Sequence, residues 1–204
     1  MVILATMGAC AARPAPIDPA TAPDPQIVPI AASFQRTLES LHADPDLRWH
    51  AGWTGNIAVN LGGPDDRGLC HQWRDAVYTG VLFDVRAQGW TARGITVNHA
   101  TPGEHHAVLV HAPTLSATDL LPDPPDAGAY VLDAWRRGRA DIYRLADWVT
   151  LPLGNHTPPA LTDIDAELRA ARRATPPAHR PGNSAKPPAG PRNHRGGPTP
   201  PGPN

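Results

Sequence analysis

Proline is spread so unevenly along this 204-residue chain that it marks out where a folded domain can lie. Six of the 26 prolines fall between residues 14 and 29, and ten fall between residues 176 and 203. The 144 residues from 30 to 173 contain only the other ten. Because proline fixes φ and lacks a backbone donor, its dense runs favour extended chain over helices and sheets. We therefore predict a single globular domain over residues 30–173, with an extended segment on each side.

Size and charge narrow the class of protein further. A domain of this length buries about two thirds of the surface that its unfolded chain exposes, so it needs neither a metal nor a disulfide to fold. The 18 basic and 19 acidic residues nearly cancel, which argues against a nucleic-acid partner whose binding depends on neutralising phosphates. No apolar run reaches the 18 residues of a membrane span. We expect a monomer with no cofactor and no metal.

The first ten residues have the character of an export signal. Residues 1–9, with the sequence MVILATMGA, are apolar and uncharged, and Cys10 follows them. This pattern is similar to the cleavage site of bacterial lipoproteins, in which the cysteine becomes lipidated. The resemblance implies an export signal over residues 1–9, a proline-rich tether over residues 10–29, and attachment to the membrane of the cell envelope through a lipid on Cys10. Cys70 would then be the one remaining thiol of an exported protein.

Periodic patterns predict the elements of the domain. Apolar residues at helical spacing predict helices over 30–42, 70–83, 141–149 and 163–174. Apolar runs and alternation predict strands over 57–61, 95–99, 105–112 and 130–135. A helical start, a run of strands and helices at the end favour the α+β class, with an antiparallel sheet.

Cys70, His106 and Asp133 are the candidate catalytic residues. The start of a helix stabilises a thiolate, because its N–H groups and dipole favour negative charge, and Cys70 begins a predicted helix. A cysteine nucleophile also needs an imidazole, and that imidazole needs a polar group to orient it. Asp133 interrupts an apolar strand, where an unpaired carboxylate would be costly, so it needs a partner. If the two strands are neighbours, Asp133 and His106 can meet.

Four short motifs occur in the order Gly-x-Cys70, Gly-Trp-x-Ala-Arg-Gly at 89–94, His106-Ala-Val, and Val-Leu-Asp133-Ala-Trp. Together they resemble the transglutaminase-like branch of the papain-like cysteine peptidases over residues 60–136. The resemblance implies a papain-like core in which Cys70 is the nucleophile, His106 is the general base and acid, and Asp133 orients the histidine. It also implies a peptide or protein substrate, with peptidoglycan as a candidate in the cell envelope.

Several alternatives remain open at this stage. His105 and His106 lie on opposite sides of a strand, so only one of them can face Cys70, and the motif favours His106. Asn60 or Gln72 would supply a second oxyanion donor. A zinc site is a minor alternative, and it would use His99, His105, His111 and Asp133.

The remaining features fit less specific roles. We expect Trp135 to wall the active site and the arginines from 136 to 139 to form a solvated turn. Residues 174–204 form a basic, proline-rich tail that is too polar to fold. The sequence thus predicts a cell-envelope cysteine hydrolase or acyltransferase that acts on an amide bond through a thioacyl intermediate. The competing prediction is a non-catalytic lipoprotein module with the same fold.

Overall fold

The computed structural model describes residues 13–47, 49, 68–101, 103–151 and 157–174 of the chain. Its elements, in chain order, are η1 (Pro19–Thr21), α1 (Ile27–Ala43), α3 (Cys70–Ala87), β1 (Thr91–Val97), β2 (His105–His111), β3 (Ala129–Asp133), β4 (Asp141–Arg144), α4 (Leu145–Val149), β5 (Ala160–Thr162) and α5 (Ile164–Ala174). The predicted export signal, Cys10, the predicted strand over 57–61 and the tail beyond residue 174 lie outside the described residues.

One five-stranded antiparallel sheet, ordered β4-β3-β2-β1-β5, organises the fold. The strands β1 to β4 follow one another as a meander, and β5 returns to pair with β1 at the opposite edge. Helices and this sheet together confirm the predicted α+β class. The order also makes β2 and β3 neighbours, so the strands that carry the candidate histidines and Asp133 lie side by side.

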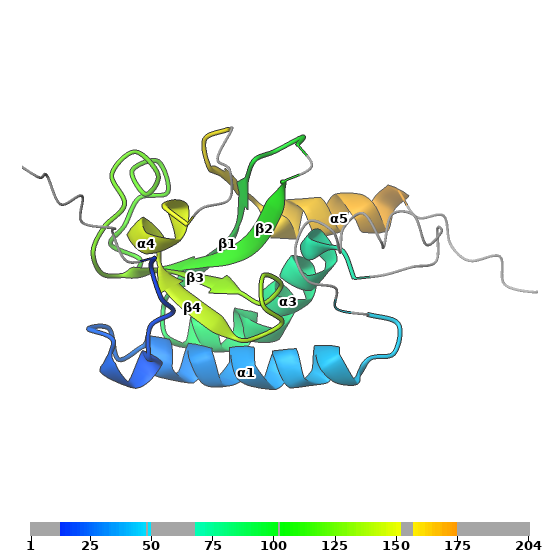
Figure 1. Cartoon of the computed structure of the whole chain (residues 1–204), viewed down its shortest axis with the longest axis horizontal. Coiled ribbons are helices and arrows are strands. Elements are labelled where there is room, and N and C mark those ends of the chain that lie inside the picture. The colour runs from blue at the N-terminus through cyan, green and yellow to red at the C-terminus, as the bar shows by residue number, and fades with distance from the viewer. Residues whose placement is uncertain (1–12, 48, 50–67, 102, 152–156, 175–204) are drawn as a thin grey trace, which may run out of the picture.

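Helices cover the two faces of the sheet unequally (Figure 1). One apolar core joins α1 and α3 to the side chains of Val108, Val110, Tyr130 and Leu132. A second core on the other face joins Ile95, Leu109 and Val131 to Trp148 of α4. Because successive strand residues point to opposite faces, this alternation determines which core each strand residue enters.

Helix α1 confirms the helix predicted over residues 30–42 and extends it by a few residues. Its buried residues Ile27, Ile30, Phe34, Leu38 and Leu41 are three or four positions apart, so they form one apolar stripe. Pro29 is tolerated in the first turn, where backbone N–H groups have no helical acceptor. The helix ends at Ala43, because Asp44 precedes Pro45 and a residue before proline avoids helical dihedrals.

The helix predicted over residues 141–149 is wrong in its first half. Residues Asp141–Arg144 form strand β4, and only Leu145–Val149 are helical. Ile142 enters the core beneath α1 and α3, whereas Tyr143 enters the core beneath α4. Pairing with β3 satisfies the backbone of this segment, and the two-sided burial suits a strand better than one face of a helix.

Part of the predicted tether packs against the domain. The backbone N–H of Ile17 donates to the carbonyl of Ile142 at 2.7 Å, which places this segment along the edge of β4. The Asp24 carboxylate accepts hydrogen bonds from the Gly128 N–H at 2.7 Å and from the Tyr130 hydroxyl at 2.6 Å. Packing therefore begins well before residue 30, the boundary predicted from the prolines.

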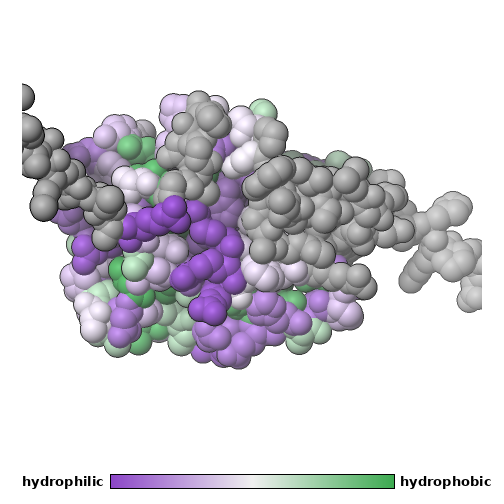
Figure 2. Space-filling view, viewed as in Figure 1, coloured by the Kyte–Doolittle hydropathy of each residue, from purple (hydrophilic) through white to green (hydrophobic). Residues whose placement is uncertain are grey.

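The surface of the described residues has few large apolar side chains. Val28 and Phe83 are the exposed ones in this part of the chain. On the face shown in Figure 2, hydrophobic patches are small and lie between hydrophilic ones. Within the described residues, no helix is both long and apolar enough to cross a membrane.

We predict that the substitution Asp24→Ala lowers the free energy of unfolding by about 2 kcal/mol, because it leaves the buried hydroxyl of Tyr130 without its acceptor. Urea denaturation measures the change. Asp126→Ala is the matched control, since Asp126 is exposed in the loop before β3. Equal stability of the two variants would show that the contacts of Asp24 with Gly128 and Tyr130 do not stabilise the domain.

Candidate active site

The first turn of α3 carries Cys70. Leu69 is the N-cap, and the Gln72 side-chain oxygen accepts hydrogen bonds from the N–H groups of Gly68 at 2.7 Å and Leu69 at 3.1 Å. Trp73 and Val77 anchor the buried face of the helix in the core. This arrangement fixes Cys70 at the position where a helix favours negative charge.

The sulfur of Cys70 lies at the start of β2. Its Sγ atom is 3.9 Å from the carbonyl oxygen of Glu104, the residue immediately before the strand. The Cys70 side chain also forms a hydrogen bond with the ring of His105, the first residue of β2. Cys70 is only 4% exposed and is part of the buried core formed by α1, α3 and one face of the sheet.

Asp133, the last residue of β3, holds the same histidine from its other side. His105 Nε2 is 2.9 Å from Asp133 Oδ2, and the carboxylate is fully buried. Because this contact occupies Nε2, Nδ1 is the ring nitrogen that remains for the thiol. Cysteine, histidine and aspartate therefore form a continuous hydrogen-bonded series across α3, β2 and β3.

Two tryptophans enclose the imidazole. The ring of His105 is 5.7 Å from that of Trp135 and 5.9 Å from that of Trp148, measured between centroids. The Trp135 indole donates to the carbonyl of Gly68 at 3.0 Å, which ties the end of β3 to the entry of α3. Trp135 was predicted to wall the active site near Asp133, and in the structure its ring lies beside that of His105.

The buried charges shift the titration of the pair. Burial alone would lower the pKa of His105, but the charge of Asp133, its hydrogen bond and that of Cys70 outweigh burial and raise the pKa to about 9. Burial opposes ionisation of Asp133 as well, yet His105 and Arg136 hold the pKa of this carboxyl well below its usual range. At neutral pH the pair is therefore an imidazolium and a carboxylate.

His106, which the motif favoured as the partner of Cys70 and Asp133, occupies a different site. His106 Nε2 is 2.6 Å from Glu104 Oε1, and Nδ1 is 2.9 Å from the hydroxyl of Thr96. Burial lowers the pKa of His106, and the nearby charge of Arg74 on α3 lowers it further, despite the hydrogen bond to Glu104. Adjacent strand residues face opposite sides, and the side that meets Asp133 is that of His105.

Other predicted roles have mixed outcomes. The side-chain oxygen of Gln72 caps α3, and Asn60 lies outside the described residues. The residues of the alternative zinc site do not converge in the part of the chain that the structure describes. His105 and His111 begin and end β2, which separates them by about 20 Å at the rise of a strand.

Two further residues, which were not predicted near Asp133, donate hydrogen bonds to its carboxylate. The Trp148 indole donates to Oδ2 at 2.9 Å. Arg136 donates to the same oxygen from Nε at 3.1 Å and to Oδ1 from its backbone N–H at 3.2 Å. The prediction of a solvated arginine turn is therefore wrong for Arg136. The sequence does contain a signal for this contact: the apolar strand ends in a carboxylate, and an arginine follows three residues later.

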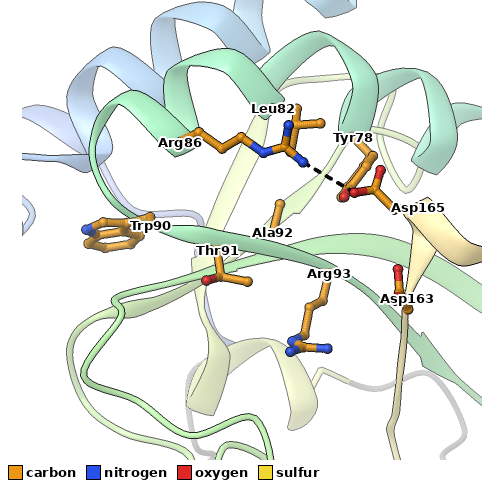
Figure 3. Close-up of a pocket in the computed structure, with 9 residues that line it drawn as sticks. All are labelled: Tyr78, Leu82, Arg86, Trp90, Thr91, Ala92, Arg93, Asp163 and Asp165. Carbon is orange, nitrogen blue, oxygen red and sulfur yellow. Dashed lines mark hydrogen bonds and ion pairs between the residues drawn. The ribbon is translucent and has the colours of Figure 1, made fainter.

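A separate cavity of about 250 Å³ lies towards the other end of α3 (Figure 3), lined by Tyr78, Leu82, Arg86, Trp90, Thr91, Ala92, Arg93, Asp163 and Asp165. Arg86 pairs with Asp165 at 3.3 Å. Asp163 accepts from the N–H of Ala166 at the start of α5. Burial and the nearby Asp165 raise the pKa of Tyr78 to about 12. None of the lining residues belongs to the series formed by Cys70, His105 and Asp133.

No protein-family model matches the chain, and neither a curated protein nor a solved structure shows significant similarity to it. The case for a functional site at Cys70, His105 and Asp133 therefore rests on the contacts among these residues.

We predict that the free energy of unfolding falls as the pH rises from about 6.5 to about 9. The folded protein raises the pKa of His105 from 6.5 to about 9, so the stability that its charge contributes is complete below pH 6.5 and is lost as the pH passes 9. The loss is on the order of 3 kcal/mol. Urea denaturation at a series of pH values measures it. In His105→Gln the decline should be much shallower, and an equally steep decline would contradict the assignment to His105.

Proposed function

We propose that the protein is a cysteine hydrolase or acyltransferase that acts on an amide bond through a thioacyl intermediate on Cys70. The observation that carries the proposal is the 2.9 Å contact between His105 and Asp133, on a histidine that also bonds the thiol at the start of α3. His105 takes the role that the motif had given to His106. A nucleophile, a base and an orienting carboxylate in hydrogen-bond contact are what this chemistry requires.

In the first half of the reaction, the Cys70 thiolate attacks the carbonyl carbon of the amide. The electron pair of the C=O bond moves to oxygen, and N–H groups at the start of a helix are suitable donors to that oxyanion. The His105 imidazolium then gives its proton to the leaving nitrogen as the C–N bond breaks. The products are a free amine and a thioester on Cys70, with neutral His105 ready to activate water or an acceptor amine.

A papain-like, transglutaminase-like core belongs to the same proposal. Its support is the cysteine at a helix start beside adjacent antiparallel strands that bring a histidine and an aspartate together. The proposed substrate class is a peptide or protein, with peptidoglycan cross-links as a candidate. The proposed place is the bacterial cell envelope, with a lipid anchor on Cys10, and this part rests on the sequence of residues 1–10 alone.

The second candidate is a non-catalytic binding or assembly module with the same fold. The burial of Cys70, which is 4% exposed with its Sγ atom beside the Glu104 carbonyl, favours it. A buried cysteine in an inert core behaves as a small apolar residue. The two candidates differ in one measurable property, the reactivity of this thiol in the folded protein.

We predict that iodoacetamide alkylates Cys70 of the folded protein at mildly acidic pH, where an ordinary thiol is almost unreactive. Peptide mapping by mass spectrometry separates Cys70 from Cys10. Hydrolysis of p-nitrophenyl acetate, a generic acyl donor, should disappear in Cys70→Ala and fall by about 100-fold or more in His105→Gln.

His106→Gln is the matched control, because its amide can still donate to Glu104, and its hydrolysis rate should stay near that of the wild type. A thiol that reacts only after denaturation would support the non-catalytic module. Loss of hydrolysis in folded His106→Gln, with retention in His105→Gln, would return the role of the base to His106.

A further inference from the structure

Arg136 extends the hydrogen-bonded series by one charged residue. It lies three residues after Asp133, in the turn between β3 and β4, and its side chain is 20% exposed. Its Nε atom is 3.1 Å from Asp133 Oδ2, the oxygen that His105 also contacts at 2.9 Å. The Nη2 atom of Arg136 is buried and has no hydrogen-bond partner among the described residues. An arginine in such a position costs desolvation, so a compensating role is expected.

The single negative charge of Asp133 is therefore shared between two cations. The Coulomb effect of Arg136 on His105 is opposite to that of Asp133, since it disfavours the protonated ring. The other groups around the pair are the thiol of Cys70 from α3, the neutral indole of Trp148 from α4, and Tyr143 of β4. Asp141 of β4 lies opposite Asp133 in the sheet, and its carboxylate pairs with Arg137 of the preceding turn. Among these groups, Arg136 is the cation in direct contact with Asp133.

We propose that Arg136 is a positioning residue that lets His105 give up its proton, and thereby sets the rate of the second half of the acyl-transfer reaction. The inference rests on the proposed function. Without Arg136, Asp133 would hold the imidazolium more strongly, and the neutral ring needed as a base would be rarer at working pH.

The second half of the reaction explains why the effect is selective. Neutral His105 accepts a proton from water as the oxygen of water attacks the thioester carbonyl. The C–S bond then breaks, the carboxylic acid leaves, and the sulfur departs as the thiolate beside the imidazolium. The first half begins from that ion pair and needs His105 protonated. Loss of Arg136 should therefore slow deacylation and leave acylation intact.

The test is pre-steady-state hydrolysis of p-nitrophenyl acetate by the full chain from mildly acidic to alkaline pH. The burst of p-nitrophenol reports acylation of Cys70, and the following linear phase reports deacylation. The neutral variant is Arg136→Gln, whose amide can still donate to Asp133. Arg136→Met, of similar length, is a second neutral variant in case the first does not fold. Arg139→Gln is the matched control, since Arg139 is exposed in the same turn.

In the neutral variant, the pH at which deacylation is half-maximal should rise by about one unit. Deacylation at neutral pH should then be about tenfold slower, with the burst unchanged. Arg136→Lys, which keeps the cation, should restore most of the rate, and Arg139→Gln should match the wild type.

If folded Arg136→Gln or Arg136→Met shows a normal burst and the same pH profile as Arg139→Gln, the role of Arg136 is overturned and the proposed function is not. A shifted profile in Arg136→Lys equal to that of Arg136→Gln would also overturn it, because charge would then not be the cause. Absence of any Cys70-dependent release of p-nitrophenol by the wild type would instead overturn the proposed function, and the role of Arg136 with it.

Discussion

The buried charge of Asp133 is the constraint on which the rest of the structure depends. A carboxylate removed from water without partners costs many kcal/mol, and this one is fully buried. It is stabilised by donors from β2, from α4 and from the turn after β3. Each donor must be in place for the charge to be tolerated, so the ends of β2 and β3 and the position of α4 are fixed together. The geometry at Cys70 follows, because His105 is one of these donors.

Local periodicity was sufficient to predict most of the fold. The apolar stripe of α1 and the spacing of Trp73, Val77 and Val81 in α3 depend only on residues within one helix. The pattern failed over residues 141–149, where Ile142, Leu145 and Trp148 also fit helical spacing. Their true arrangement, a short strand followed by a short helix, is decided by pairing with β3. Such pairing involves residues distant in sequence, and no local pattern contains it.

Two of the three residues of the candidate site could be chosen from local sequence. Cys70 was a candidate because it begins a helix, and Asp133 because it is a carboxylate within an apolar strand. The choice between His105 and His106 could not be made from spacing, since neighbouring strand residues differ only in the face they enter. Trp148 on one face and Arg74 on the other decide it. Arg136 looked like part of a solvated turn because it stands in a run with two other arginines, Arg137 and Arg139, and the sequence does not show its contact with buried Asp133.

The hydrogen bond from the Trp135 indole to the Gly68 carbonyl joins the segment before Cys70 to the segment after Asp133, and neither of its atoms is ionisable. A proton gained or lost by cysteine, histidine or aspartate therefore leaves this brace unchanged. The Trp49 indole reinforces it by donating to the carbonyl of Trp135 at 2.7 Å. These two hydrogen bonds hold the ends of α3 and β3 together whatever the charge state of Cys70, His105 and Asp133.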